Sequence, residues 1–348
     1  MVSAGQLQVR EADDSLLAEW DRYVERCPEA TFFHRSGWKR VIESCFGHRT
    51  YYLYAERAGH IAGILPLVHI DSAIFGRSLK SLAFCVYGGT AASDEAARSA
   101  LDRATRELGE RLDVTSIEYR DLEPRAYPDA TKKSGLYVTF RKSIDADPEK
   151  NMLAVPRKQR AMIRKGQKFA LRSEIDADCA RLHRIYAESV RNLGTPVFSR
   201  KYFEALRTTF GKDCEILVIT KDEEPLAAVM SFYFRDEVLP YYGGGTHLAR
   251  DFAANDFMYW EVMRRACERG YRVFDFGRSK QGTGAFDFKK NWGFPAQPLD
   301  YQYILRHGAK VPDLNPLNPK LSVFVNAWKR LPLPLANALG PHIVKYLG

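Results

Sequence analysis

The chain has 348 residues, of which 45% are hydrophobic and 27% are charged. This composition is typical of a folded protein and excludes a disordered chain. The length allows two domains of ordinary size or one large domain. The net charge of +9 favours a polyanionic partner (nucleic acid, a phosphorylated ligand or an anionic membrane surface), although a solvated basic surface would give the same charge.

Cysteine usage and the first residues bear on the compartment. The six cysteines are scattered, with no C-x-x-C pair and no histidine cluster beside them. This spacing predicts no metal site and no disulfide framework, so we expect a reducing, cytoplasmic environment. The opening MVSAGQLQVREADD lacks the apolar segment of a signal peptide. No run approaches the roughly 18 apolar residues that a membrane-spanning helix needs.

In chain order, hydrophobic periodicity first predicts helices over 16–27 and 37–45. Two strands within 50–71 follow, joined at Ala58-Gly59, and then a third strand from residue 79 that ends in Tyr87-Gly88-Gly89. An amphipathic helix is expected after it, from about 94 to 112. A strand over 114–122 closes this first set of elements.

The same order returns in the second half of the chain. Helices are expected over 180–193 and 200–210, strands over 215–222, 226–237 and 238–245, a helix over 253–268 and a strand over 272–279. The third strand again carries Tyr-Gly-Gly, at Tyr242. This predicts a duplicated unit, with two coincidentally similar units as the alternative. We predict domains over 1–150 and 151–310, the second opening with a basic helical segment at 151–170, and a tail over 311–348.

Two helices, a strand, a hairpin, a strand, a helix and a strand form the order of the GNAT acyltransferase fold, which this order of elements resembles. We therefore predict an α/β protein with mixed sheets and two tandem GNAT-like domains, as an analogy of fold. A CoA-dependent GNAT enzyme usually holds pyrophosphate on a glycine-rich turn before the helix. Here that junction reads THLARDFAAND, where Asp251 and Asp256 would repel pyrophosphate and Arg250 partly offsets them. Standard use of acyl-CoA is therefore disfavoured.

Four stretches resemble the FemAB (FemX-type) aminoacyltransferases, which move an aminoacyl group from tRNA to an amine on a peptidoglycan precursor. They are TFFHRSGWKRVIE with Trp38 and Arg40, PRKQRAMIRKGQK, FDFGRS with Asp275, and FKKNWG with Lys289. In FDFGRS, Arg278 replaces the family's second glycine. The amino-acid sequence as a whole most resembles the FemAB-related proteins of exosortase (PEP-CTERM) exopolysaccharide systems.

The resemblance implies roles for particular residues. Lys289 would stabilise the negative charge that acyl transfer builds on the carbonyl oxygen, as an alternative to a solvated lysine at a helix end. Asp275 would orient Arg278 or the acceptor amine, as an alternative to a structural ion pair. Direct transfer to an amine needs no protein nucleophile. The substrate-binding residues expected are Trp38, Arg40, Arg157, Arg160, Arg164, Tyr242 and Arg278.

The basic stretch 156–172 holds seven basic residues and no acid, and helical spacing places Arg157, Arg160 and Arg164 in one stripe. Such a stripe would contact tRNA or a lipid-linked pyrophosphate, or be a solvated helix face. The segment NLGTPVFSRKYF carries Phe198 where the family places a phosphate-binding arginine, so the acceptor would differ from a nucleotide-linked muropeptide. The tail mixes apolar residues with Trp328 and basic side chains, which suits either a membrane interface or packing on the body.

Our hypothesis is an acyltransferase that forms an amide on an amine-bearing envelope, exopolysaccharide or peptidoglycan precursor. It would use aminoacyl-tRNA as donor and no bound cofactor, and it would be cytoplasmic or peripheral at the inner membrane through its tail. One alternative is a GNAT N-acetyltransferase that acts on an amino sugar with acetyl-CoA. The other is a non-catalytic GNAT-like adaptor in a polysaccharide-assembly complex.

Overall fold

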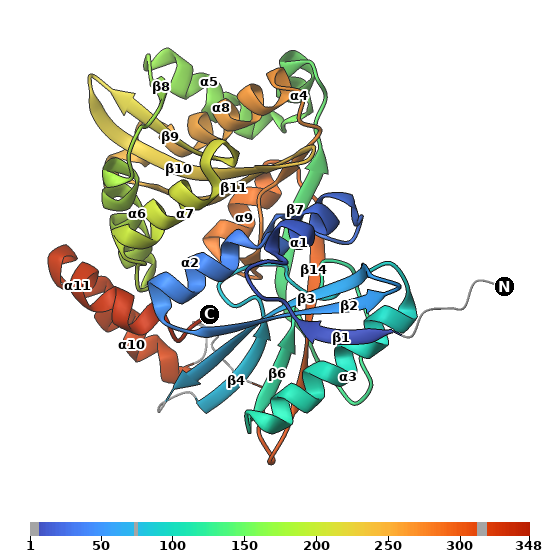
Figure 1. Cartoon of the computed structure of the whole chain (residues 1–348). Helices are drawn as coiled ribbons and strands as arrows, with labels where there is room; N and C mark the ends of the chain where they lie inside the picture. Colours follow the sequence, from blue (N-terminus) through green and yellow to red (C-terminus); the bar gives the residue numbers. More distant parts are fainter. Residues whose placement is uncertain (1–6, 73–75, 312–318) are drawn as a thin grey trace. The chain divides into compact units, whose positions relative to one another are not determined.

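The computed structural model describes residues 7–72, 76–311 and 319–348, with side chains in the last range from 322 onward. The chain forms two compact units (Figure 1). Unit 1 comprises Met1–Leu136, Leu299–Pro312 and Tyr346–Gly348, and unit 2 comprises Tyr137–Pro298 and Asp313–Lys345. These limits differ from the bounds 1–150, 151–310 and 311–348 expected from the sequence. The reason is that two long strands, β7 (Thr131–Ser143) and β14 (Ala296–Leu305), each run across the division.

The strands of unit 1 follow the order β1-β2-β3-β4-β6-β14. They are β1 (Gln8–Glu11), β2 (Arg49–Arg57), β3 (His60–Ser72), β4 (Gly76–Ser81), β6 (Ser116–Tyr119) and the end of β14, while β5 (Ala91–Ala92) pairs with β3. The helices are α1 (Leu17–Arg26), α2 (Gly37–Phe46) and α3 (Glu95–Arg111). The β2–β3 turn lies at Ala58-Gly59, as predicted, and both residues have positive φ.

The third strand of unit 1 is shorter than predicted. It ends at Ser81, and the chain is irregular until β5 because Leu82 and Phe84 adopt positive φ. The N–H groups of Gly88 and Gly89 instead both donate to the carbonyl of Arg120, each at 3.0 Å. The Tyr-Gly-Gly of unit 1 therefore lies against the residue that follows β6, outside any strand.

The strands of unit 2 follow the order β7-β12-β11-β10-β9-β8. They are β8 (Arg172–Ile175), β9 (Cys214–Lys221), β10 (Glu224–Phe234), β11 (Glu237–Gly245) and β12 (Val273–Asp275), and β13 (Ser279–Lys280) pairs with β7. The helices are α4 (Pro148–Ala154), α5 (Arg157–Lys168), α6 (Ala180–Leu193), α7 (Arg200–Phe210), α8 (Ala254–Glu268), α9 (Gly284–Asn291), α10 (Pro319–Arg330) and α11 (Leu333–Val344). Helices α6 and α7 have the predicted limits.

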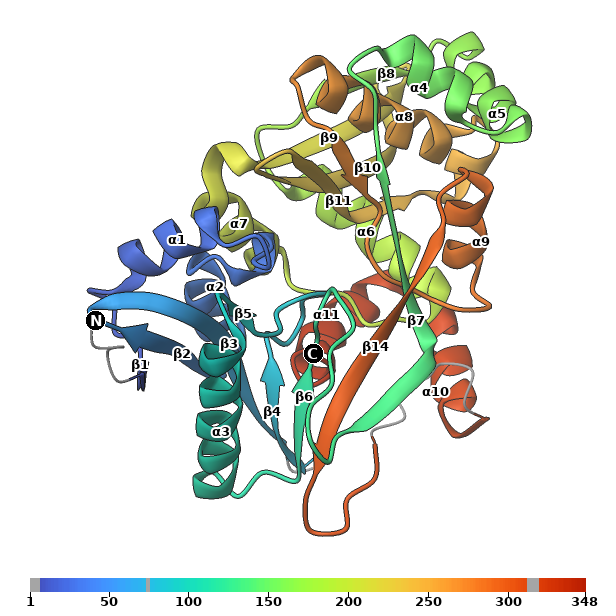
Figure 2. The ribbon, with the colours of Figure 1, turned by 90° about the vertical axis from the view of Figure 1, so that its right-hand side faces the viewer.

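Each unit has its own hydrophobic core. In unit 1, α3 buries Leu101 and Leu108 against β2 and β3. In unit 2, α8 packs on β9, β10 and β11 and is in turn covered by α5 (Figure 2). Strand β14 pairs antiparallel with β6, with Gln302 opposite Tyr119, and so completes the sheet of unit 1. Within the described ranges, no helix combines the length and the hydrophobicity needed to cross a bilayer.

Candidate active site

The end of β12 is the centre of the candidate site in unit 2. Strands β11 and β12 pair in parallel only at Glu237–Val273 and Val238–Phe274, although β11 continues to Gly245. Strand β11 also contains a bulge, because Met230 of β10 pairs with Tyr242 and the next residue, Ser231, pairs with Pro240. Bulges bend a strand and increase its twist. Beyond Phe274, the two strands therefore no longer share hydrogen-bonded pairs.

Asp275 is the last residue of β12 and its carboxylate is buried. Its Oδ1 accepts a hydrogen bond from the N–H of Gly277 at 2.7 Å and one from the Thr139 hydroxyl at 3.4 Å. Gly277 has a φ of +67°, which a glycine adopts at little cost. The carboxylate thus fixes a sharp turn over residues 275–278, with Arg141 on β7 as a more distant ion-pair partner at 3.9 Å.

Lys289 lies on helix α9, and its side chain reaches this turn. Thr283 caps that helix by accepting from the N–H of Phe286, so the QGTG stretch is a helix start. The Lys289 Nζ donates to the carbonyls of Phe276, Gly277 and Arg278 at 2.7, 3.0 and 3.1 Å. Burial lowers the pKa of this amine to about 7, although the charge of Asp275 acts in the opposite direction. A buried ammonium at this turn is a localised positive charge that can donate a hydrogen bond to a developing anion.

Arg278 lies at the same turn. Its guanidinium carbon is 4.5 Å from the centroid of the Tyr137 ring, and the side chain is half-buried. Its backbone carbonyl is one of the three that hold Lys289. The structure therefore brings Asp275, Arg278 and Lys289 together, as the FDFGRS and FKKNWG motifs led us to expect.

Tyr242 lies in an aromatic cluster of unit 2. Its hydroxyl is 2.7 Å from that of Tyr202, and its ring makes edge contacts with Tyr186, Phe198 and Phe203. The side chain is buried. Phe198, which stands in place of the family's arginine, covers Tyr202 with ring centroids 4.6 Å apart. Tyr242 contributes packing in this arrangement, and its predicted contact with substrate stays a prediction.

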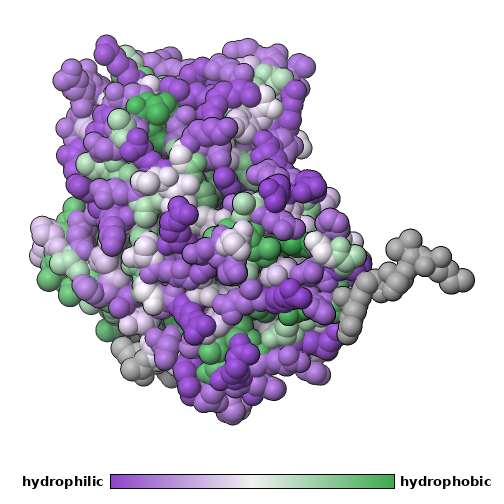
Figure 3. Space-filling model, viewed as in Figure 1, coloured by the Kyte–Doolittle hydropathy of each residue, from purple (hydrophilic) through white to green (hydrophobic). Residues whose placement is uncertain are grey.

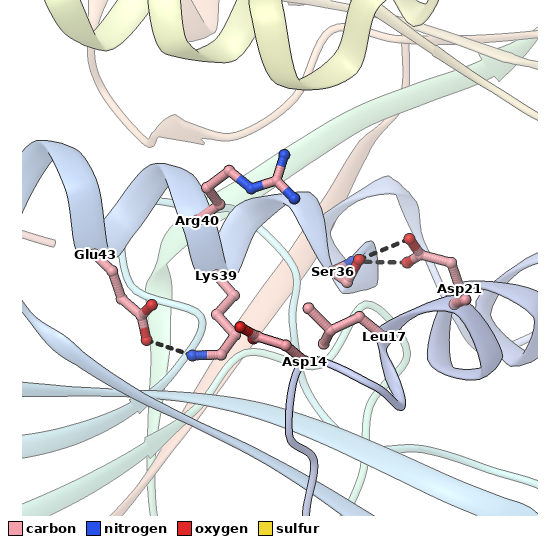
Figure 4. Close-up of a pocket in the computed structure, with 8 residues that line it drawn as sticks. Asp14, Leu17, Asp21, Ser36, Lys39, Arg40 and Glu43 are labelled. Atoms are coloured by element: carbon pink, nitrogen blue, oxygen red, sulfur yellow. Dashed lines mark hydrogen bonds and ion pairs between the residues drawn. The ribbon is translucent and has the colours of Figure 1, made fainter.

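Arg40 lines a pocket of about 350 Å³ between α1 and α2 of unit 1 (Figure 4). Within the pocket, Ser36 donates twice to Asp21 and Lys39 donates to Glu43 at 2.6 Å. Arg40 points away from the Lys39–Glu43 pair, and its exposed guanidinium has no ion pair or hydrogen bond within the described residues. It is the pocket's available cation.

Trp38 does not line this pocket. It is fully buried on the opposite side of α2, where it packs on Phe32 and Phe33 with ring centroids 5.9 and 5.7 Å away. By packing there, Trp38 holds α2 in place and so helps to position Arg40. A fully enclosed ring cannot contact a ligand, so Trp38 does not bind substrate directly in this structure, contrary to our prediction.

Arg157, Arg160 and Arg164 lie on α5, as predicted. The opposite face of this helix, with Ile163 and Gly166, is buried, whereas Arg157 and Arg164 are exposed and Arg160 is half-buried. Within the described ranges none of the three arginines has an acidic partner. The stripe is therefore a real basic face, and its ligand stays a prediction.

The start of α8 is where a GNAT enzyme would hold pyrophosphate. Asp256 does not face that position, contrary to our expectation: it is buried and accepts from Gln159 and from the Trp292 indole. A different acid occupies the junction, because the Glu188 carboxylate accepts the backbone N–H of His247 at 2.9 Å. Arg250 is exposed nearby in sequence. The backbone N–H of His247 already donates to a carboxylate, so it is not available to bind pyrophosphate.

Three of these residues were missed in the sequence: Glu188 on α6, and Thr139 and Arg141 on β7. Their sequence separation from the turn gave no signal, since Thr139 lies far from Asp275 in the chain and meets it only through sheet pairing. Glu188 likewise lies far from His247 in the chain, so no motif in the sequence pointed to any of these three residues.

Comparison with known proteins agrees with this architecture. The family model for an acetyltransferase (GNAT) domain matches residues 157–290, from the start of α5 to the lysine pair of α9. The solved structure of FemX superimposes with a TM-score of 0.66 at 15% identity, covering 84% of this chain and 96% of that one. The fold is a tandem GNAT fold.

Two further structures support the tandem GNAT fold. A C-terminal domain (DUF2156) of a putative lysylphosphatidylglycerol synthetase from Agrobacterium fabrum gives a TM-score of 0.55 at 12% identity, over 84% of this chain and 92% of that one. A tandem GNAT protein from the clavulanic acid biosynthesis pathway gives 0.54 at 12% identity, over 88% and 100%. No curated protein matches the sequence. The domain match and the shared fold support an acyltransferase.

Proposed function

We propose that this tandem GNAT protein transfers an aminoacyl group from aminoacyl-tRNA to an amine on a cell-envelope precursor, of the exopolysaccharide or peptidoglycan type. The observation that carries the proposal is the Lys289 ammonium, which is desolvated and held on three carbonyls at the end of β12. That position follows the point where β11 and β12 stop pairing. The fold shared with FemX supports the choice of reaction.

In the proposed reaction, the acceptor nitrogen attacks the ester carbonyl of the donor. The new C–N bond forms, the ester C–O bond breaks, and the ribose oxygen leaves with the proton that the amine gives up. Lys289 stabilises the oxyanion between these events, an effect worth about 3 kcal/mol for one well-placed donor. Its three N–H bonds are all engaged, so one carbonyl of the turn must yield its place to the reacting oxygen.

The choice of donor is supported at two places in unit 2. The Glu188 carboxylate on the N–H of His247 opposes a CoA pyrophosphate before α8. The exposed arginines of α5 offer the phosphate-binding face that a tRNA requires. Arg250 is the feature that favours the second candidate, an acetyl-CoA-dependent N-acetyltransferase that acts on an amino sugar. We assign the unpaired Arg40 in its pocket to an anionic group of the acceptor.

A direct comparison of donors tests this assignment. Purified protein is titrated with acetyl-CoA by calorimetry and with a mixed aminoacyl-tRNA pool by filter binding. We expect binding of the tRNA pool, with affinity that falls steeply as salt rises, and no heat from acetyl-CoA. Binding of acetyl-CoA with acetylation of glucosamine would instead establish the N-acetyltransferase. Binding of neither donor would favour the non-catalytic adaptor.

The role of α5 is tested with matched charge changes. Reversing Arg157, Arg160 and Arg164 to Glu is expected to lower tRNA affinity by about a hundredfold and to flatten its salt dependence. The control reverses Arg22, Arg103 and Arg111, which are exposed arginines of unit 1, and alters the net charge equally. Equal losses in both variants would show that only net charge matters and would remove α5 from the proposed site.

A further inference from the structure

Helices α10 and α11 expose apolar side chains on one face of unit 2. Hydrophobic atoms gather over these helices at the left edge of the view in Figure 3. The exposed fractions are 66% for Leu193 at the end of α6, 73% for Val323, 41% for Phe324, 45% for Leu335 and 43% for Leu339. We name these five residues the apolar face. Patches of this kind on a folded protein mark sites of interaction.

Helix α11 is apolar on both of its sides. Ala336, Gly340 and Val344 are buried, whereas Leu335 and Leu339 are exposed one helical turn apart, with exposed Ala338 between them. Packing on the body therefore explains only the first set. Exposed leucines on a helix whose other side is already packed are expected to contact lipid or another protein.

The two helices are held firmly on unit 2. Gly340 approaches the backbone of Val197 so closely that a Cβ there would lie 2.8 Å from the Val197 oxygen. The Arg191 guanidinium donates to the carbonyl of Lys329 at 3.1 Å, and Trp328 is buried and stacks with Phe324. Of the two alternatives for the tail, Trp328 therefore follows packing on the body. The apolar face is a preformed surface.

Charge separates the possible occupants of this surface. From residue 314 to residue 348 the sequence contains no Asp or Glu, and it contains Lys320, Lys329, Arg330 and Lys345. Lys329 and Arg330 are exposed at the end of α10, with no acidic partner within the described ranges. In a symmetric dimer built on these two helices, the 314–348 segment of neither copy would offer an acid to pair with these cations. An anionic bilayer complements both the apolar side chains and the cations.

We propose that the apolar face docks unit 2 on the surface of an anionic lipid bilayer, with Leu335 and Leu339 inserted at the acyl boundary and Lys329 and Arg330 among the headgroups. The proposal is independent of the transferase chemistry assigned to Lys289. It gives an enzyme with an envelope-precursor substrate a way to reach lipid-linked acceptors.

Vesicle sedimentation with the full chain tests the docking. The vesicles contain phosphatidylcholine alone, or phosphatidylcholine and phosphatidylglycerol in equal parts. We expect binding to the mixed vesicles and little to the neutral ones. Replacing Leu335 and Leu339 by Ser should weaken binding roughly tenfold, because two large apolar side chains are removed from the contact. Replacing Lys329 and Arg330 by Gln should weaken it by roughly fivefold per charge.

Two controls keep the result specific. Leu153 on α4 is 65% exposed, so Leu153→Ser removes an apolar side chain elsewhere and should leave binding unchanged. The Arg157, Arg160 and Arg164 reversal shows whether α5 supplies the attraction. The proposal is overturned if wild-type protein ignores mixed vesicles, or if the α5 reversal abolishes binding while the Leu335 and Leu339 change does not. Concentration-dependent dimerisation that the two Ser changes abolish would assign the face to a second copy instead.

Discussion

Units 1 and 2 repeat one order of elements but end their central strands differently. In unit 1, the Tyr-Gly-Gly segment lies against the chain after β6, and the buried Arg120 guanidinium bonds to Glu118 at 2.8 Å and to the Cys85 carbonyl at 2.8 Å. In unit 2, the equivalent glycines of β11 approach helices: Gly243 meets Tyr259 of α8, and Gly244 meets Ser189 of α6. The end of β6 in unit 1 is thus enclosed by Arg120 and the Tyr-Gly-Gly segment, and we call it sealed. In unit 2, the carbonyls that follow β12 accept hydrogen bonds from Lys289 instead.

The acids at the two strand ends show the same contrast. Asp121 in unit 1 is buried beneath Gly89, accepts from the Tyr127 hydroxyl at 3.1 Å, and has a pKa that burial raises to about 7. Asp275 in unit 2 accepts a hydrogen bond from the N–H of Gly277 and so holds the turn whose carbonyls accept from Lys289. The acid at the strand end thus contributes to packing in unit 1. We therefore place the proposed chemistry in unit 2.

The largest expected effect comes from opening the sealed strand end. Arg120→Met removes the guanidinium that lies 2.8 Å from the buried Glu118 carboxylate, whose other ion-pair partner, Lys80, is 3.7 Å away. We expect unit 1 to lose about 3 kcal/mol of unfolding free energy, because the buried carboxylate loses the nearer of these two cations. Denaturant unfolding measures this loss. The double variant Arg120→Met with Glu118→Leu should recover most of it, and a failure to recover would contradict the sealing role of this pair.

Gly89→Ala tests the same seal sterically. A Cβ at this position would collide with the Asp121 carboxylate and come within 3.0 Å of its Cα. We expect a loss of about 2 kcal/mol in the same unfolding measurement, because the enclosed carboxylate must be displaced. Gly284→Ala is the comparison, because Gly284 has neither a positive φ nor a neighbour within 4 Å of the missing Cβ. Similar losses at both positions would mean that the contact with Asp121 does not set the cost.

The pH dependence of Lys289 sharpens the account of unit 2. The pKa of this amine is lowered to about 7, so the ammonium form is lost as the pH rises through that value. If the ammonium stabilises the oxyanion, the ratio of wild-type rate to Lys289→Met rate falls about tenfold per pH unit above pH 7. Taking the ratio removes titration of the acceptor amine. A ratio that rises through pH 7 would identify Lys289 as a base instead.

Gly277→Ala should have the smallest effect on stability. The residue has a φ of +67° and open space around the missing Cβ, so only backbone strain opposes the substitution. We expect a cost of about 1 kcal/mol in unfolding free energy. Its activity should fall further than this cost explains, because the turn carries the carbonyls that hold Lys289. Unchanged activity would show that the turn geometry is irrelevant to the reaction.

Local patterns predicted much of this fold. The limits of α6 and α7, the Ala58-Gly59 turn and the repeated order of elements followed from periodicity and turn chemistry. The return of β14 to β6 and the break after Ser81 were missed, because both depend on pairing partners that are distant in sequence. Among the candidate site residues, the family-like motifs drew attention to Asp275, Arg278 and Lys289, whose roles stay predictions. Burial of Trp38 and Tyr242 and the position of Glu188 on His247 became visible only in three dimensions.

Transfer kinetics of the neighbouring lysines Lys289 and Lys290 test the central claim most directly. Radiolabelled aminoacyl-tRNA is the donor and an extract of lipid-linked envelope precursors is the acceptor. Lys289→Met should lower the rate of amide formation by about a hundredfold with tRNA binding intact, because it removes the ammonium from the β12 turn. Lys290→Met, which changes an exposed residue, should match wild type. Transfer at the wild-type rate by the Lys289→Met variant would contradict the account.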